Sequence, residues 1–152
     1  MPWQTIWRKQ KMSDSNTNTE TMDNKLIIRR TFDAPRERVF RAFTEPDHVA
    51  RWLGPGSMTG EVHALELEPG GAYSVSMSDE TNRYDVEGEV LEVVENERLV
   101  HTWEPGRVTI ELRDVDERCE VVFTHEGLPN ADTAEGHAAG WESALDNLSA
   151  VL

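Results

Sequence analysis

The sequence has a single cysteine, three lysines and no long apolar run. Cys119 alone cannot form an intramolecular disulfide, and this scarcity of cysteine is typical of a reducing compartment. No apolar segment approaches the roughly 18–20 residues of a membrane-spanning helix. The opening residues, MPWQTIWRKQKM, are partly basic but include no apolar stretch of the kind that a secretory signal contains. We therefore expect a cytoplasmic protein without a membrane span.

Basic residues are scarce relative to acidic ones. There are 15 lysines and arginines against 29 aspartates and glutamates, which gives a formal net charge of −14. An acidic surface repels phosphate groups, so we expect no nucleic-acid partner. The same charge is compatible with a cytoplasm of high salt, where ions screen the self-repulsion of the surface. We hypothesise a halophilic origin on this ground.

Motifs with a defined catalytic or metal-binding chemistry are also lacking. No two histidines stand at a metal-binding spacing, so with one cysteine we expect no metal, and we predict no cofactor. The serines do not lie in a G-x-S-x-G nucleophile motif. The segment Pro69-Gly70-Gly71 lacks the length and the lysine of a phosphate loop and predicts a β-turn. Cys119 falls on an apolar strand face, which would raise the pKa of its thiol and indicates an inert core residue.

The length of 152 residues predicts one domain preceded by a tail. Residues 1–24 include the polar segment SDSNTNTETMDN, which has too few apolar groups to offset the entropy of ordering. We predict a flexible tail here; docking of Trp3, Ile6 and Trp7 onto the domain is the alternative. Residues 25–152 are predicted to fold as one domain.

The predicted domain begins with a strand and two short helices. LIIRRTF at 26–32 alternates loosely and is rich in β-branched residues, as strands are. A helix is predicted over about 35–44, with Asp33 as its N-cap. Pro46 begins a second short helix, which Gly54-Pro-Gly56 ends. This second helix carries Val49, Trp52 and Leu53 on one side.

Six segments then alternate apolar and polar residues with a period of two. Turn residues separate them and no connection is long enough for a helix, which predicts an antiparallel meander. The six predicted strands are 61–67, 72–77, 84–94, 99–103, 108–112 and 119–125.

The last segment, DTAEGHAAGWESALDNLSAVL, predicts the one long helix, with Asp132 or Thr133 as its cap. An apolar stripe and a polar face can be assigned at helical spacing. The stripe is Trp141, Leu145, Leu148 and Leu152, with Ala144 and Val151 beside it, and the face predicted to meet water is Glu142, Asp146 and Asn147. A helix with one stripe and a sheet with one apolar face must share a core. We therefore predict an α+β helix-grip fold, in which a curved antiparallel sheet of about six or seven strands wraps around the C-terminal helix.

Four blocks of the sequence resemble a known family. FDAPRERVFRAFTEPDHVARWLGP, LELEPGGAYSVSM, RLVHTW and GWESALDNLSAVL are similar, in this order, to the activator of heat-shock protein 90 ATPase homologue family. That family belongs to the START-like (SRPBCC) superfamily, with its polyketide-cyclase-like and birch-pollen-allergen members. The resemblance covers about 25–152 and implies a helix-grip fold with an apolar cavity between the sheet and the last helix.

Large apolar residues and two histidines on the predicted core face are candidates to line that cavity. The candidates are Trp52, Tyr73, Met77, His101, Trp103, Phe123, His125 and Trp141. The alternative for the aromatic residues is that they fill the core, which the stripe position of Trp141 favours. For His101 and His125 the alternative is a core-edge histidine hydrogen-bonded to the backbone. His48, His63 and His137 are interpreted as surface or helix-edge residues.

Three hypotheses for function follow. The first is a binding protein that holds a small hydrophobic or amphipathic molecule under the C-terminal helix. The second is an enzyme of the cyclase, aromatase or hydrolase kind, with His101 or His125 as general base. The third, which the family name implies, is a chaperone-associated interaction protein. Eukaryotic members carry a separate N-terminal domain for chaperone binding where this chain has about 24 polar residues, so we rank it below the first two. We expect a monomer or weak dimer.

Overall fold

Alternating burial along the chain defines the strands in the computed structural model, which describes residues 17–54 and 56–152. Along β2 (Lys25–Phe32), buried and partly buried positions alternate, and Leu26, Ile28 and Phe32 face the core. This is the period of two that a strand with one face on a core requires. The other strands are β1 (Thr17–Thr21), β3 (Thr59–Leu65), β4 (Ala72–Ser78), β5 (Arg83–Val94), β6 (Arg98–Thr102), β7 (Arg107–Val115) and β8 (Arg118–Glu126).

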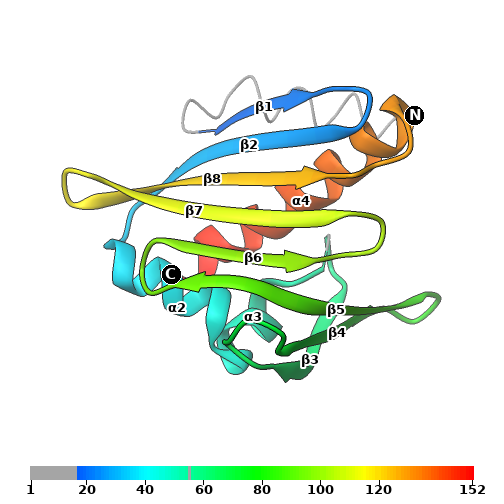
Figure 1. Ribbon diagram of the computed structural model, residues 1–152, viewed down its shortest axis with the longest axis horizontal. Coiled ribbons are helices and arrows are strands. Elements are labelled where there is room, and N and C mark those ends of the chain that lie inside the picture. Colours follow the sequence, from blue (N-terminus) through cyan, green and yellow to red (C-terminus); the bar gives the residue numbers. More distant parts are fainter. Residues whose placement is uncertain (1–16, 55) are drawn as a thin grey trace.

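The eight strands form one antiparallel sheet in the order β1-β2-β8-β7-β6-β5-β4-β3. The long helix α4 (Ala131–Val151) runs across one face of this curved sheet (Figure 1). Two short helices, α2 (Arg36–Thr44) and α3 (Pro46–Trp52), connect β2 to β3 beside the end of α4 (Figure 1). The predicted α+β fold, a curved sheet around a long C-terminal helix, is confirmed.

The eighth strand lies in the segment that was predicted to be a flexible tail, and for residues 17–21 that prediction is wrong. Strand β1 pairs with β2 from Thr17 opposite Arg30 to Thr21 opposite Leu26. An edge strand needs only backbone partners and tolerates polar side chains, and threonine is well suited to a strand. The rest of the predicted tail, residues 1–16 with Trp3, Ile6 and Trp7, lies outside the described residues.

The helix caps differ from the predicted ones. Helix α2 has Pro35 at its N-cap position and no side-chain cap, so the assignment of Asp33 is wrong. Helix α4 is capped by Asn130, whose Oδ1 accepts a hydrogen bond from the backbone N–H of Thr133 at 2.9 Å. Asparagine is among the strongest N-cap residues because its short side chain reaches this orphan donor. Neither Asp132 nor Thr133 is the cap.

The apolar stripe of α4 packs against the sheet. Trp141, Leu145 and Leu148 are buried as predicted, and two alanines extend the stripe toward the start of the helix. Those alanines are Ala134 and Ala138, both almost inaccessible. Leu148, Leu145 and their neighbours on the sheet form one continuous core, which fixes α4 on the sheet.

The polar face of α4 is less exposed than predicted. Glu142 is only 4% exposed, because β1 lies over it and the Thr19 hydroxyl donates to its Oε1 at 2.7 Å. Asn147 is partly buried and donates through Nδ2 to the carbonyl of Gly54 at 3.1 Å. Asp146 is exposed and pairs with the largely buried Arg30. The prediction that these side chains face water is therefore wrong for Glu142 and incomplete for Asn147.

Candidate functional site

A groove runs along one side of α4, and the helix forms its first wall. The wall residues recur at three- and four-residue intervals, so they share one face of the helix. They are Thr133, Gly136, His137, Gly140, Trp141 and Ala144. A Cβ atom added at Gly136 or Gly140 would meet nothing within 4 Å, so at these two positions the groove reaches the helix backbone.

The second wall comes from the sheet and from the end of α3. It consists of Met77 on β4, Tyr84 on β5, Trp103 after β6 and Gly54 after α3. The backbone of Gly54 has φ of +106°, a conformation that favours glycine. The groove encloses about 470 Å³. This volume lies within the roughly 300–1,000 Å³ of small-molecule sites, which are mostly apolar.

Two tryptophans that line the groove are in contact with each other. The ring centroids of Trp103 and Trp141 lie 4.7 Å apart with the planes inclined at 59°, and the ring centroid of Phe123 lies 4.6 Å from that of Trp141. Both tryptophans are almost fully buried. Only a small part of each ring meets the groove, and the rest belongs to the core.

His125 holds Trp141 in place. The indole N–H of Trp141 donates to Nδ1 of His125 at 3.1 Å, and His125 Nε2 lies 2.7 Å from the carbonyl oxygen of Pro105. The carbonyl can only accept, so Nε2 carries the proton and Nδ1 is the acceptor. Burial lowers the pKa of His125, which keeps the ring neutral. Both ring nitrogens are therefore engaged within the protein.

His101 is enclosed more completely. Its Nδ1 donates to the backbone carbonyl of Thr102 at 2.9 Å, and its ring stacks on Tyr73 with centroids 3.8 Å apart. Burial lowers the pKa of His101 to about 4 and raises that of Tyr73 far above its ordinary value. Both histidines thus make the backbone hydrogen bonds that the core-edge interpretation requires.

Trp52, the last residue of α3, packs in the core against α2. Its indole N–H donates to the carbonyl of Ala42 at 2.7 Å, and its ring meets Phe43 edge-on with centroids 5.2 Å apart. The side chain is 3% exposed and is not among the residues that line the groove. Gly54, two residues further along the chain, is the part of this segment that reaches the groove.

The structure thus divides the eight candidate residues into two groups. Met77, Trp103 and Trp141 line the groove. The others pack in the core beside it: Trp52, Tyr73, His101, Phe123 and His125. Sequence reasoning missed most of the helix wall, although Gly136, Gly140 and Ala144 stand at intervals of four residues. That spacing of small residues on one helix face was the available signal.

The similarity of the chain to known proteins agrees with this fold. The family model described as Activator of Hsp90 ATPase homolog 1-like protein matches residues 33–152. The chain belongs to this family. The resemblance noted in the sequence is therefore confirmed. No curated protein matches the chain.

Solved structures of other family-like proteins share the architecture. A protein from Chromobacterium violaceum is 30% identical, with a TM-score of 0.77, and the match covers 84% of this chain and 96% of that chain. A protein from Nitrosomonas europaea is 22% identical, with a TM-score of 0.75 and coverage of 85% and 94%. The AHSA1 protein from Silicibacter pomeroyi is 21% identical, with a TM-score of 0.74 and coverage of 83% and 95%. The last two likenesses show the fold alone.

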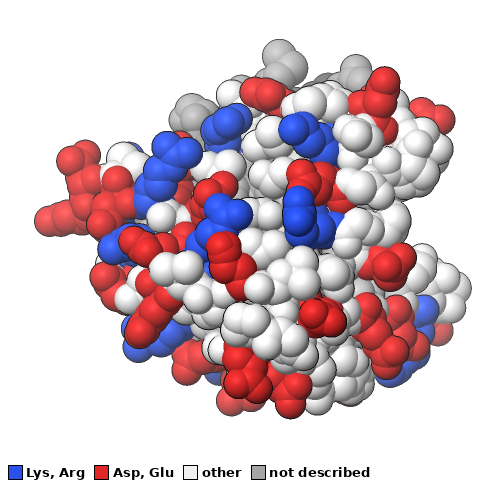
Figure 2. All heavy atoms as spheres, in the orientation of Figure 1, with Lys and Arg blue, Asp and Glu red and all other residues white. Residues whose placement is uncertain are grey.

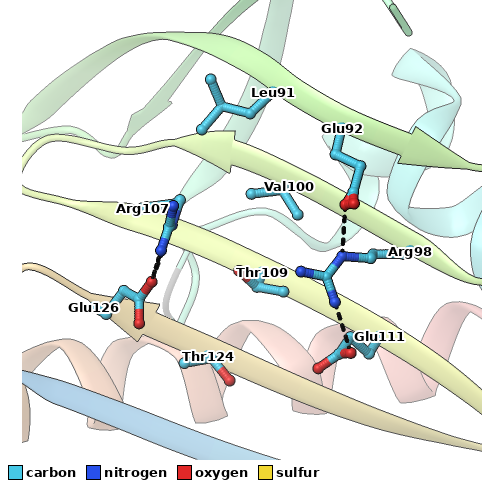
Figure 3. Close-up of a pocket in the computed structure, with 9 residues that line it drawn as sticks. All are labelled: Leu91, Glu92, Arg98, Val100, Arg107, Thr109, Glu111, Thr124 and Glu126. Atoms are coloured by element: carbon cyan, nitrogen blue, oxygen red, sulfur yellow. Dashed lines mark hydrogen bonds and ion pairs between the residues drawn. The ribbon is translucent and has the colours of Figure 1, made fainter. Parts of the chain in front are cut away.

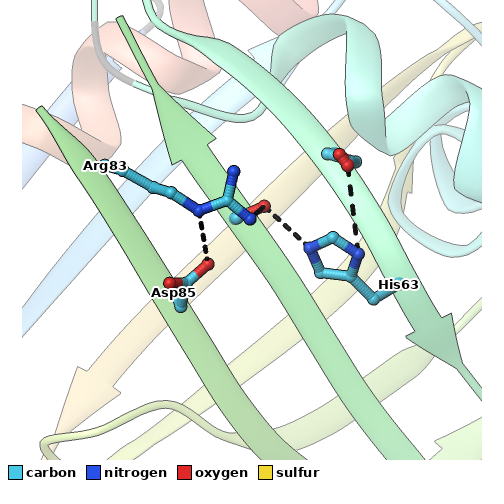
Figure 4. Close-up of polar contacts among 5 residues, drawn as sticks. His63, Arg83 and Asp85 are labelled. Carbon is cyan, nitrogen blue, oxygen red and sulfur yellow. Dashed lines mark hydrogen bonds and ion pairs between the residues drawn. The ribbon is translucent and has the colours of Figure 1, made fainter.

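A polar cluster on strands β3, β4 and β5 of this family member contains a serine beside a histidine. Arg83 donates through Nη2 to the hydroxyl of Ser76 at 3.3 Å, and that oxygen lies 2.8 Å from Nε2 of His63 (Figure 4). His63 Nδ1 is 3.9 Å from Glu61, and Arg83 also pairs with Asp85 (Figure 4). The order of these groups resembles that of a hydrolytic triad.

The surroundings of Ser76 do not support nucleophilic catalysis. The residue is 2% exposed and lies in the middle of β4, paired with Glu61 on one side and Asp85 on the other. Its neighbours' backbone N–H groups belong to sheet ladders, so they are not free to form an oxyanion hole. The cluster is a cross-strand hydrogen-bond network on the sheet.

The outer face of the sheet carries a second hollow of about 550 Å³. Its two arginines are both paired: Arg98 bonds Glu92 at 2.9 Å and Glu111 at 2.8 Å, and Arg107 bonds Glu126 (Figure 3). Because carboxylates already neutralise these cations, the described residues of the hollow present no unpaired positive charge to an anion.

The thiol of Cys119 belongs to the core. Cys119 is fully buried, and burial raises the pKa of its thiol to about 11, which fits an inert core residue. Among residues 17–54 and 56–152, no cluster of His, Cys, Asp and Glu has three members placed to hold a metal ion. No helix within the same residues has the length and apolar character to cross a membrane.

Proposed function

We propose that the protein binds a small hydrophobic or amphipathic molecule in the groove along α4. The observation that carries this proposal is the bare helix wall at Gly136 and Gly140, which faces an apolar wall formed by Met77 and Trp103. Glycine inside a helix is about 1 kcal/mol less favourable than alanine. The helix therefore gives up stability at the two positions where a larger side chain would fill the groove.

An enzymatic role has less support. The two histidines suggested as general bases do not line the groove, and both ring nitrogens of His125 are already hydrogen-bonded. His137 does line it, but among the described residues that line the groove there is no carboxylate, lysine or serine to complete an acid–base or nucleophilic pair. The groove is thus better equipped to hold a molecule than to transform one.

The first test is native mass spectrometry of the protein purified from its own host. A co-purifying small molecule at near-stoichiometric amount, identified after denaturation, would support the proposal and name the chemical class. If the purified protein contains no co-purifying molecule, an uncharged fluorescent probe, Nile red, can test whether the groove binds an apolar ligand. We expect Nile red to bind and brighten, as it does in an apolar site.

The matched variants are Gly140→Leu and Ala150→Leu. Both add a leucine side chain to α4, but position 140 lines the groove and position 150 is exposed near the helix end. Since Cβ has open space at Gly140, the first variant should fold with unchanged or raised thermal stability. Nile red binding should fall at least about tenfold in Gly140→Leu, because the leucine fills the space, and stay unchanged in Ala150→Leu. Equal binding by both variants would contradict the proposal.

A further inference from the structure

The hydrogen bonds of His125 fix the position of its ring proton. The carbonyl of Pro105 can only accept and lies 2.7 Å from Nε2, whereas the indole N–H of Trp141 can only donate and lies 3.1 Å from Nδ1. Nε2 therefore carries the proton, and Nδ1 supplies the lone pair. His125 is 0% exposed, so both partners are groups of the protein itself. The arrangement is complete only while the imidazole is neutral.

A second proton on His125 is incompatible with its bond to Trp141. An imidazolium ring is a donor at both nitrogens, so the new N–H at Nδ1 would face the indole N–H, one donor against another. Nε2 would keep its bond to Pro105, because a carbonyl oxygen also accepts from a charged ring. Protonation therefore breaks one of the two bonds of His125, and that bond is the one to Trp141.

Displacement of Trp141 would change the groove directly. Its ring contacts Trp103 and Phe123, with centroids 4.7 and 4.6 Å away, and it also lines the groove. The same wall is open at Gly140, where an added Cβ would meet nothing within 4 Å. An indole ring that leaves His125 therefore has room to move into the space that a ligand would occupy.

The titratable groups that face His125 in the described part of the chain are two further histidines. His137 on α4 packs edge-on against it with ring centroids 5.1 Å apart, and His101 on β6 interacts with it electrostatically. A positive charge on either neighbour opposes a second charge on His125. The charged side chains on the adjoining elements alternate to the outer face of the sheet or are exposed: Lys25, Glu104, Arg107, Glu126, Asp132 and Glu135. Burial, and after it the neighbouring His137, lower the pKa of His125 below its ordinary value of 6.5.

We propose that the contact between His125 and Trp141 is a pH switch for the groove: a proton on Nδ1 displaces the indole, and the displaced ring expels the ligand. The first half of this inference, displacement of Trp141, needs no ligand, and the second half rests on the function proposed above. Since the folded-state pKa of His125 is lowered, binding should be complete above pH 6.5 and lost as the pH falls through the folded-state pKa.

Nuclear magnetic resonance of the indole N–H groups tests the first half in the full chain without a ligand. Between about pH 7.5 and about pH 5, the Trp141 signal should shift or broaden, because its acceptor is lost. Trp52 is the internal control, since its indole donates to the carbonyl of Ala42, which does not titrate. A Trp141 signal that stays constant, or that changes only together with the Trp52 signal as the fold is lost, would overturn the inference.

Three variants assign the effect to the two residues of the switch. His125→Gln retains polar atoms at this position but cannot titrate, so the Trp141 signal should become independent of pH. His137→Gln is the matched control, which removes the neighbouring imidazole and should leave the response of Trp141 in place. Trp141→Phe keeps an aromatic ring without the indole donor. It identifies the Trp141 signal by its absence, and it takes the place of His125→Gln in the binding test if that variant does not fold.

Nile red binding at the same two pH values tests the second half. The wild-type affinity should fall at least about threefold in acid, because only chains with a neutral His125 bind. The affinity of His125→Gln and of Trp141→Phe should not depend on pH, and the surface variant His48→Gln should behave as the wild type.

The outcomes separate this inference from the proposal beneath it. If Nile red does not bind at neutral pH, the proposed function fails together with the second half, and the Trp141 signal still decides the first. If Nile red binds in the groove but its affinity is unchanged in acid, or falls equally in His125→Gln, the switch alone is overturned.

Discussion

The indole N–H of Trp141 donates to Nδ1 of His125. Trp141 lines the groove and His125 does not, so a core histidine fixes the orientation of a tryptophan on the groove wall. The predicted cavity histidine is thus a positioning residue for a tryptophan. Its other nitrogen is bound to Pro105, which leaves His125 a single ring orientation and a single tautomer.

The Trp141–His125 pair should show energetic coupling. In a double-mutant cycle with Trp141→Phe and His125→Phe, we expect a coupling free energy of about 1 kcal/mol from the lost hydrogen bond. Equilibrium denaturation in urea measures it. As control, a cycle of His125→Phe with Trp52→Phe should be additive, because Trp52 donates to Ala42 elsewhere in the core. Additivity of the first pair would show that the hydrogen bond contributes nothing.

Trp52→Ala should destabilise the fold without changing the groove. Removal of a buried tryptophan side chain costs about 3–5 kcal/mol of unfolding free energy. Nile red affinity, measured where the variant is still folded, should match the wild type because Trp52 does not line the groove. A small loss of stability together with a changed affinity would instead identify Trp52 as a lid over the ligand.

Stability should fall as the pH drops below about 6.5, and His101 is one cause. Burial lowers its folded-state pKa to about 4, so between these two values the unfolded chain binds the proton that the folded chain excludes. The stability contribution is complete above the unfolded-state pKa and is lost as the pH falls through the folded-state pKa. The full effect amounts to about 3 kcal/mol.

The comparison with His101→Phe isolates this contribution from the many carboxylates. The variant has no imidazole at this position, so its unfolding free energy should decrease less steeply between neutral pH and about pH 4.5. The variant His48→Gln, at a half-exposed surface site, should keep the wild-type slope. Identical slopes for His101→Phe and the wild type would refute the assignment.

Added salt should stabilise the protein. Acidic side chains are spread over the face shown in Figure 2, and the formal net charge is −14, so screening relieves repulsion in the folded state. We expect the thermal midpoint to rise steadily from low salt to molar KCl. The triple variant Glu80→Gln, Glu87→Gln and Glu117→Gln removes exposed charges and should show a weaker salt response. A midpoint indifferent to KCl would contradict the halophilic hypothesis.

Much of the fold was predictable because it depends on local periodicity. Seven predicted strands and three helices occur at the expected places, since alternation with a period of two or of 3.6 is visible in any short window. Strand β1 was missed because TNTET has no apolar pattern, and its stability comes from pairing with β2. The cap Asn130 was missed because several polar residues near the start of α4 were equally plausible.

The candidate site was less predictable. The sequence identifies residues on the core face, but it does not say which of them meet empty space. Trp52 and Trp103 both look like cavity residues in the sequence, yet only Trp103 lines the groove. Tyr84 was missed because its place opposite α4 depends on how the β4–β5 hairpin curves.

The sequence by itself determined the family, the order of the elements and the faces that enter the core, because these follow from side-chain periodicity and local motifs. Tertiary structure alone decided that β1 covers Glu142, that His125 orients Trp141 and that Gly136 and Gly140 border open space. Each of these relationships joins residues on different elements or depends on what surrounds them. They arise when curvature and packing bring the elements together, and no pattern within one segment records them.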